Sequence, residues 1–260
     1  MKLERLELET DGEVARVWLN RPEVRNAFDG LMVTELRRVF DELGADEALR
    51  VIVLGGRGKA FSAGADLEWM KAVAEFGHED NVRDARALAD VFLAISRSPK
   101  PVVARVQGAA LGGGAGLVAA CDIAVAALGT RFGFSEVRLG LVPAVISPYV
   151  IGRIGESAAR ELFLTGERFD AEQARDMGLV RAVVPETELD AAVGERVGEL
   201  LLAGPCAIAE AKALIREVSG RRVEDVQSDT VERIASIRAS EEGREGLRAF
   251  LEKRKPRWTS

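Results

Sequence analysis

The chain has 260 residues, of which 47% are apolar and 30% charged, as in a globular protein with one substantial core. Its formal net charge of -6 excludes proteins that hold nucleic acid on a broad basic surface, although a local basic cluster could still meet a phosphate. No apolar run approaches the ~20 residues of a membrane span, and no signal-peptide core opens the chain, so we expect a cytoplasmic protein without nucleic-acid or membrane partners.

The first part of the chain starts with strand signals. Residues 3–9 and 13–19 are predicted to form two strands joined by an Asp-Gly turn, a strong short-range signal for a hairpin. Asp29 is a suitable cap for a helix whose apolar positions recur up to Gly44, where a helix can end. The run 51–54 is wholly apolar, which is typical of a strand covered on both faces.

Further along the chain, helical stretches and apolar runs alternate, and glycine-rich loops join them. The expected elements are a helix from about residue 66, a helix over 81–97, a strand over 102–106, a helix over 115–121 and a strand over 123–126. This alternation predicts an α/β domain. From about residue 186 the strand signals vanish, so we divide the chain into an α/β core, 1–195, and a helical C-terminal region, 196–260, with a joint at Gly204-Pro205.

Cysteine and histidine are scarce and form no pattern of metal ligands. Cys121 and Cys206 lie far apart in the sequence, and we expect both to be reduced, buried side chains. The single histidine, His78, has no nucleophile and orienting acid nearby, which favours a surface position over a catalytic triad. We therefore predict no metal site and no histidine-dependent nucleophile.

Two glycine-rich segments each follow an apolar strand and open a helix: 61–67, the first loop, and 108–114, the second loop. A helix N-terminus offers free backbone N–H groups, and small residues let a ligand come close to them. Two such donors converging on one oxygen would form an oxyanion hole, and Gly113 is also expected to need a positive φ. For either loop alone, glycines that merely serve a tight turn are the alternative. A phosphate-binding P-loop is excluded because no Gly-Lys-Ser/Thr follows.

Motifs that carry a family resemblance are spread over nearly the whole chain. They are Leu19-Asn20-Arg21-Pro22, Asn26-Ala27-Phe28, the two loops, Cys121-Asp122-Ile123, Phe134-Ser135-Glu136, Gly140-Leu141-Val142-Pro143, Leu164-Thr165-Gly166, Ala171 to Leu179, and the ending Phe250 to Trp258. Together they resemble the crotonase (enoyl-CoA hydratase/isomerase) superfamily. The resemblance implies a crotonase-like spiral of β-β-α units, with a helical C-terminal region through which subunits form a homotrimer, commonly doubled into a hexamer.

The resemblance also implies a site for an acyl-CoA substrate. The backbone N–H groups of Ala65 and Gly113 would bind the thioester oxygen, and Glu136 would move protons. The residues expected to contact substrate or CoA are Arg25, Ala27, Ala63, Asp66, Leu67, Gly112, Pro143, Ala144 and Lys253. Coenzyme A would be part of the substrate, so no separate cofactor is expected. The basic end around Lys253 would meet CoA phosphates, often of a neighbouring subunit; a frayed, solvated tail is the alternative.

One departure from the resemblance bears on the reaction. The best-known hydratases of the family use two glutamates, but here the first position is Gly116 and only Glu136 is present. A single carboxylate can still shuttle protons in hydration, or move a proton from C2 to C4 of a 3-enoyl thioester in the Δ3,Δ2-enoyl-CoA isomerase reaction. Hydratase is the first interpretation, isomerase the second, and a CoA-ester binder without turnover the third. A surface acid beside Arg138 is the non-catalytic alternative for Glu136.

The segment 135–149 together with Gly116 resembles the methylglutaconyl-CoA and isohexenylglutaconyl-CoA hydratases. Their substrates are branched and carry a free carboxylate, which Arg138 or Tyr149 could meet. A plain fatty enoyl-CoA is the alternative substrate. The sequence alone does not decide between them.

Overall fold

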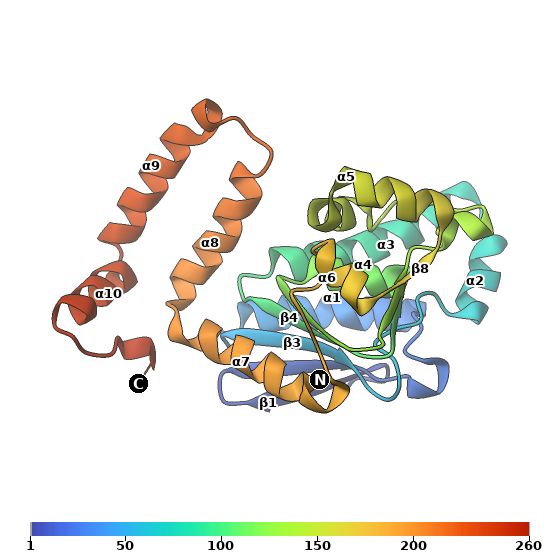
Figure 1. Ribbon diagram of the computed structural model, residues 1–260, viewed down its shortest axis with the longest axis horizontal. Helices are drawn as coiled ribbons and strands as arrows, with labels where there is room; N and C mark the ends of the chain where they lie inside the picture. Colours follow the sequence, from blue (N-terminus) through green and yellow to red (C-terminus); the bar gives the residue numbers. More distant parts are fainter. Residues whose placement is uncertain (1, 260) are drawn as a thin grey trace.

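The computed structural model describes residues 2–259, and a six-stranded sheet forms its centre (Figure 1). The first two strands pair antiparallel, as the predicted hairpin requires, and the others join in parallel. In sheet order the strands are β1 (Leu6–Asp11), β2 (Val14–Leu19), β3 (Val51–Gly56), β4 (Val102–Val106), β6 (Ile123–Ala127) and β9 (Ala182–Val184). The expected α/β fold is confirmed.

A second, smaller sheet supports the start of the second loop. Its strands, in sheet order, are β5 (Ala109–Leu111), β7 (Arg131–Gly133) and β8 (Arg168–Asp170). Each has three residues, too few for an alternating pattern to show, so the sequence does not predict them.

Helices connect and cover the strands. In chain order they are α1 (Gly30–Ala45), α2 (Leu67–Ala74), α3 (His78–Arg97), α4 (Gly113–Ala120), α5 (Ser147–Thr165), α6 (Ala171–Asp176), α7 (Leu189–Leu202), α8 (Pro205–Val218), α9 (Val223–Ala239) and α10 (Glu241–Leu251), with the 3-10 helices η1 (Pro22–Val24), η2 (Glu136–Leu139), η3 (Glu186–Glu188) and η4 (Arg257–Thr259). Asp29 caps α1 as predicted, accepting from the N–H of Met32 at 2.8 Å. Gly44 lies inside the last turn of α1 instead of following it. Between residues 2 and 259, no helix has the length and apolarity that crossing a membrane requires.

The two faces of the large sheet are covered by different helices. Ala15 and Val17 of β2 point into the main core, which includes side chains of α1, α3 and α4. On the opposite face, Val14 of β2 and Val53 of β3 pack against α7. Because β3 contributes to both clusters, it is buried on both faces, as its apolar run 51–54 predicts.

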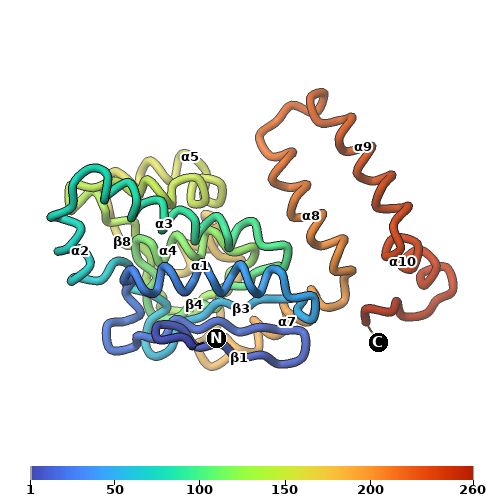
Figure 2. Tube along the Cα trace, turned by 180° about the vertical axis from the view of Figure 1, so that it is seen from behind, coloured from blue at the N-terminus to red at the C-terminus, as the bar shows by residue number. Residues whose placement is uncertain are grey.

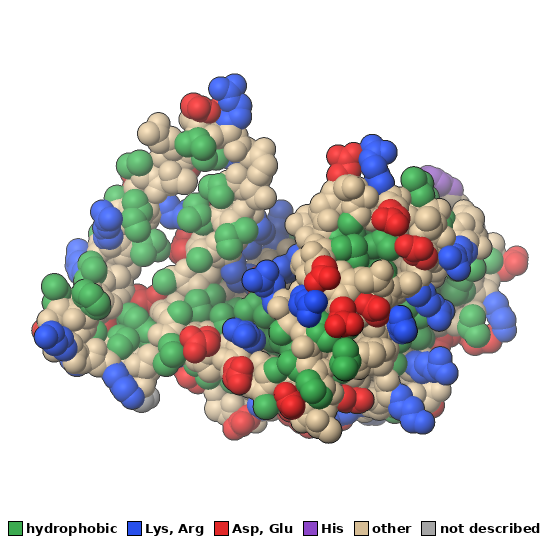
Figure 3. All heavy atoms as spheres, in the orientation of Figure 1, with side chains coloured by type: hydrophobic (Ala, Val, Ile, Leu, Met, Phe, Trp, Pro, Cys, Tyr) green, Lys and Arg blue, Asp and Glu red, His purple; other side chains and the backbone are tan. Residues whose placement is uncertain are grey.

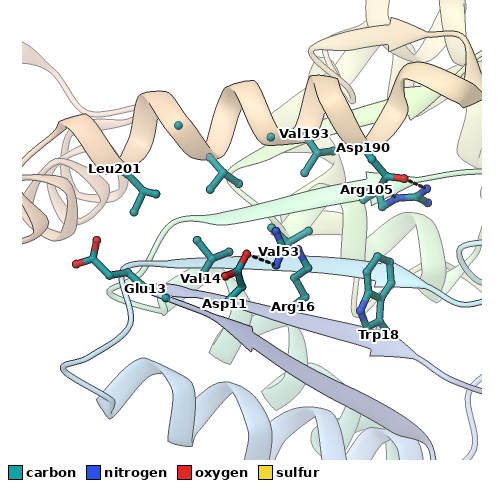
Figure 4. A pocket seen from close by; sticks show the side chains of 14 residues that line it. Asp11, Glu13, Val14, Arg16, Trp18, Val53, Arg105, Asp190, Val193 and Leu201 are labelled. Atoms are coloured by element: carbon teal, nitrogen blue, oxygen red, sulfur yellow. Dashed lines mark hydrogen bonds and ion pairs between the residues drawn. The ribbon is translucent and has the colours of Figure 1, made fainter. Parts of the chain in front are cut away.

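A hollow of about 550 Å³ lies between α7 and the sheet on this second face (Figure 4). Its floor is apolar, with Val14, Val53 and Val193 among the lining residues. Part of its charged rim is paired, because Arg105 donates to Asp190 at 2.6 Å. No residue that lines this hollow belongs to the first or the second loop. The predicted site therefore lies elsewhere.

The last helices leave the core. Figures 1 and 2 show α8, α9 and α10 projecting from one end of the molecule; we call them the arm. The boundary predicted after residue 195 falls within α7, which packs on the sheet, so the arm starts at the joint after Gly204. Lys212 of α8 fastens the arm to the core by donating to Asp122 at 2.5 Å.

The scarce cysteine and histidine side chains lie in three different settings. His78 is exposed at the first residue of α3, as predicted. Cys121 is free and buried, as predicted, and burial raises the pKa of its thiol. The prediction of a buried Cys206 is wrong: this free thiol is exposed at the start of α8, because the arm leaves the core there.

Candidate active site

The first and second loops run side by side. The N–H of Ser62 donates to the carbonyl of Ala109 at 3.0 Å, and the N–H of Leu111 donates to the carbonyl of Ser62 at 3.0 Å. Gly64 has φ 92, and a Cβ on it would lie 2.9 Å from the Leu111 carbonyl oxygen. A glycine is therefore required where the two backbones touch, and the two loops lie against each other at this point.

Ala65 of the first loop has a free backbone donor. The loop forms a parallel bridge with Phe28, whose N–H donates to the Gly64 carbonyl at 2.7 Å and whose carbonyl accepts from the N–H of Asp66 at 2.8 Å. The backbone groups of the residues on either side of Ala65 thus form the hydrogen bonds of the bridge. Within residues 2–259 the N–H of Ala65 has no hydrogen-bond partner, and the residue is exposed.

Gly113 offers the second donor. It is the first residue of α4, where backbone N–H groups have no acceptor within the helix. Its own N–H finds no partner elsewhere in the described chain, whereas the N–H of Gly112 donates to Gly133 at 2.9 Å. The expectation that Gly113 needs a positive φ is wrong; the positive φ belongs to Gly112, with φ 50 and ψ -120.

Glu136 lies directly beside the second loop, at the first residue of η2. Its Oε1 would be 3.3 Å from a Cβ on Gly112, and its Oε2 is buried without a hydrogen-bond partner. Burial raises the pKa of Glu136 above its ordinary value, and a hydrogen bond from its own backbone N–H offsets this only in part. Arg138 donates to the Thr165 carbonyl at 3.1 Å, and Oε2 of Glu136 is buried without a partner, which disfavours the alternative of a solvated or salt-bridged acid beside Arg138.

Gly116 lies one helical turn after Gly112, since its N–H donates to the Gly112 carbonyl at 3.0 Å. A Cβ there would overlap the Ile146 side chain and lie 3.1 Å from Cε1 of Phe92. The space that a second acid would need is thus filled by apolar side chains. Tyr149 stands next to them, half-buried, with its ring centroid 5.9 Å from that of Phe92.

Several residues expected to line the CoA groove lie together. The carbonyl of Arg25 accepts from the N–H of Ala63 at 2.9 Å, and Ala27 is buried close by in the chain. Asn26, quoted in a motif without a role, is fully buried and donates to the Ala60 carbonyl at 2.8 Å. Arg25 and Asn26 both have left-handed φ values, 54 and 55, a feature that sequence patterns do not reveal.

Asp66 and Leu67 begin α2. The Asp66 carboxylate caps the helix by accepting from the N–H of Glu68 at 2.8 Å, and it lies 3.0 Å from Nη1 of Arg21. Burial tends to raise the pKa of Asp66, but these hydrogen bonds and the guanidinium together hold it below its ordinary value. Asp66 therefore has a structural task, and its contact with CoA stays a prediction. Leu67 is 74% exposed.

Pro143 and Ala144 lie between η2 and α5, so they follow Glu136 closely; Pro143 is buried and Ala144 exposed. Lys253 is exposed just after α10, on the arm, and Figure 1 shows the arm and α2 at opposite ends of the molecule. Within one chain Lys253 is therefore remote from the first loop. The basic end is not frayed, because Arg254 donates to the buried Glu245 at 2.7 Å.

The geometry agrees with comparisons to known proteins. The enoyl-CoA hydratase/isomerase family profile matches residues 9–260. The chain is 39% identical over 247 residues to a Thermus thermophilus protein named as an enoyl-CoA hydratase, covering 95% of this chain and 98% of that protein. It is 32% identical over 263 residues to the crotonyl-CoA hydratase of Syntrophomonas wolfei, covering 100% of both. A solved enoyl-CoA hydratase/isomerase (crotonase) from Legionella pneumophila is 46% identical, with TM-score 0.92 over 99% of this chain and 100% of that one. The chain therefore belongs to the enoyl-CoA hydratase/isomerase (crotonase) family.

Proposed function

We propose that the protein is an enoyl-CoA hydratase that adds water across the 2,3 double bond of an acyl-CoA thioester. One observation carries this proposal: the carboxylate of Glu136, whose Oε2 is buried without a partner, has its Oε1 beside the loop that presents the free N–H of Gly113. The free N–H of Ala65 belongs to the loop that touches it. A proton acceptor and two carbonyl-binding donors are the groups that hydration of a thioester needs.

In the proposed reaction, the N–H groups of Ala65 and Gly113 hold the thioester oxygen and draw electron density away from C3. The oxygen of a water molecule bonds to C3 while Glu136 accepts the water's proton. The C2–C3 π electrons move toward the thioester, whose oxygen becomes the enolate oxygen. Glu136 then returns the proton to C2, and the carbonyl re-forms. Losing one oxyanion donor in such a site costs about 100- to 1000-fold in rate.

A raised pKa suits Glu136 to both steps. A carboxylate that accepts and returns a proton works best when its pKa lies near the working pH. Burial raises the pKa of Glu136 in that direction. Because Ile146 and Phe92 occupy the space next to Gly116, one acid has to perform both transfers.

The acyl group is the finer part of the proposal. A relative named crotonyl-CoA hydratase favours a short, unbranched enoyl group. The segment 135–149 instead resembles hydratases of branched, carboxylate-bearing substrates, but Arg138 donates to Thr165 and so is partly occupied. We propose the unbranched thioester as the first substrate and 3-methylglutaconyl-CoA as the competing one.

The isomerase reaction is the second candidate, because a single acid among apolar side chains also suits it. Glu136 would take a proton from C2 of a 3-enoyl thioester and return it at C4, without water. A CoA-ester binder without turnover is disfavoured, since Glu136 and both free donors are retained.

We also propose that the enzyme is a cytoplasmic homotrimer or a hexamer of two trimers. Figure 3 shows apolar side chains on the surface of the arm. Among the residues of the arm, Phe250 is 81% exposed and Leu251 78%. Large apolar side chains left exposed on one helical extension suggest a contact with another chain. In such an assembly, Lys253 would meet the CoA phosphates of a neighbouring subunit, which its own chain does not allow.

The test offers crotonyl-CoA, 3-methylglutaconyl-CoA and a 3-enoyl-CoA to the purified protein, with products identified by mass spectrometry. A hydrated product gains the mass of one water, whereas an isomerised product keeps its mass. Glu136→Gln should lower turnover by at least ~100-fold while CoA-ester binding changes little, because shape is kept and the proton acceptor is lost. Normal turnover by that variant would show that Glu136 is not the proton shuttle.

A further inference from the structure

Phe28 is attached to the first loop through its backbone. Its N–H donates to the Gly64 carbonyl at 2.7 Å, and its carbonyl accepts from the N–H of Asp66 at 2.8 Å. These two bonds bracket Ala65 and fix the direction of the Ala65 N–H. The position of the first donor thus depends on where the backbone of Phe28 lies.

The side chain of the same residue meets the second loop. A Cβ on Gly113 would lie 2.7 Å from Cε2 and 3.2 Å from Cδ2 of the Phe28 ring. The ring therefore lies against the main chain of Gly113, with no room for a side chain between them. Phe28 is fully buried in the main core, so the ring has no solvent side toward which it could retreat.

The segment that carries Phe28 is itself held firmly. The carbonyl of Ala27 accepts from Nη1 of Arg21 at 2.7 Å, and the carbonyl of Asn26 accepts from Oγ of Ser62 at 2.9 Å. Arg21 also lies 3.0 Å from Asp66, so one guanidinium ties this segment to the first loop. A displacement of the backbone at Phe28 would have to break several of these bonds.

We propose that Phe28 is a positioning residue that sets the separation of the two oxyanion donors, with its backbone fixing Ala65 and its ring fixing Gly113. The inference rests on the proposed function of these N–H groups. An oxyanion hole works only when both donors lie about 2.7–3.1 Å from the same oxygen. A misplacement of about 1 Å can cost on the order of 100-fold in rate. Phe28 touches no substrate in this scheme; it acts through the two loops.

The test replaces the ring and keeps the backbone. Phe28→Leu removes the contact with Gly113 but leaves both hydrogen bonds to the first loop. Phe40→Leu is the matched control, since Phe40 is equally buried in the same core but lies in α1. Both variants should lower the melting temperature similarly. Only Phe28→Leu should lower kcat, by about 10- to 100-fold, with little change in KM.

A spectroscopic readout separates positioning from general loosening. A conjugated enoyl thioester absorbs at longer wavelength when donors polarise its carbonyl, so wild type and Phe40→Leu should shift the band of a bound chromophoric enoyl-CoA equally. Phe28→Leu should bind it with a smaller shift. If Phe28→Leu does not fold, Phe28→Met, whose flexible unbranched side chain adapts to irregular core space, replaces it with the same expectation. Equal kcat and equal band shift in the Phe28 and Phe40 variants would overturn the positioning role. A wild-type protein that turns over no enoyl-CoA would overturn the proposed function instead.

Discussion

The loops of the proposed site and the helices of the arm differ in how closely they are packed by the rest of the chain. In the loops, the packing is so close that a Cβ on Gly64 would overlap the Leu111 carbonyl and a Cβ on Gly113 would overlap the Phe28 ring. In the arm, α8 and α9 bury one residue each and α10 two, whereas α1 alone buries seven. One chain therefore packs both loops of the proposed site completely, while the arm leaves apolar surface that its own chain does not cover.

The arm is nonetheless held in a defined direction. Arg50, 7% exposed, donates to the Trp258 carbonyl at 2.7 Å and so joins the end of the chain to the core. Burial lowers the pKa of Lys212, and its ion pair with Asp122 acts against that shift. Because breaking an ion pair with one buried partner is costly, this pair and the Arg50 bond both favour the observed placement of the arm.

The largest effect is expected where the loop packing is closest. Gly113→Val places a branched side chain against the Phe28 ring, already 2.7 Å from a Cβ. The second donor is displaced, so turnover of every acyl-CoA tested should be abolished, whether the product is hydrated or isomerised. Rates are measured by mass spectrometry after circular dichroism has shown that the variant folds.

Gly152→Val is the control, because a Cβ on Gly152 of α5 meets nothing within 4 Å. It should fold and turn over like wild type. A folded Gly113→Val protein with near-normal activity on any thioester would rule out the oxyanion hole and, with it, the proposed mechanism.

The arm gives the next largest effect. The double change Phe250→Asp and Leu251→Asp puts charges on its two most exposed large apolar side chains among those described. A buried apolar anchor contributes about 2 kcal/mol or more to an interface, which corresponds to about 30-fold in Kd. The protein should therefore shift toward monomers in size-exclusion chromatography with light scattering, while its circular dichroism stays that of a folded core.

Leu128→Asp is the matched control, because Leu128 is 59% exposed but lies in the α/β part of the chain, outside the arm. This variant should keep the assembly. An unchanged molar mass in the arm variant would mean that the arm does not hold the subunits together.

The two regions also differ in how far the sequence predicts them. Local patterns suffice for the cap at Asp29, the doubly buried β3 and the two loops, because neighbouring residues decide each of them. The filling of the space at Gly116 could not be predicted, since Ile146 is distant in sequence and reaches it only through the fold. The ring contact of Phe28 with Gly113 was missed for the same reason.

Gly116→Glu tests whether Ile146 fills this space, and we expect a moderate effect on stability and turnover. A glutamate there would overlap Ile146, so overpacking should destabilise the fold by about 1–3 kcal/mol and lower turnover. Ile146→Gly in the same chain opens the space and should restore part of the stability. The free energy of unfolding in urea measures both. If the single variant is as stable as wild type and hydrates crotonyl-CoA faster, the space is open and Ile146 does not fill it.

The smallest expected effect is on the melting temperature, because the buried carboxylate of Glu136 destabilises the folded state when it is charged. Burial raises its pKa in the folded state, so between the unfolded and the folded pKa the native protein binds more protons than the unfolded chain. The contribution of Glu136 to stability is therefore largest below the unfolded pKa, about 4.3, and is lost as the pH rises through the folded value. Glu136→Gln should consequently raise the melting temperature at a pH above the folded pKa, where wild type carries the buried charge.

The gain should shrink as the pH falls toward the unfolded pKa, because wild type then carries a neutral carboxyl like the amide. Melting curves of both proteins over a pH series measure it, and Glu156→Gln, at an exposed acid on α5, corrects for the general effect of removing a charge. A buried carboxylate oxygen without a hydrogen-bond partner should destabilise the fold. Such a loss of stability is common at active sites, where the same group is needed for turnover. A Glu136→Gln protein that melts below wild type at a pH above the folded pKa would mean that the charged carboxylate is stabilised in the fold, and the raised pKa would be wrong.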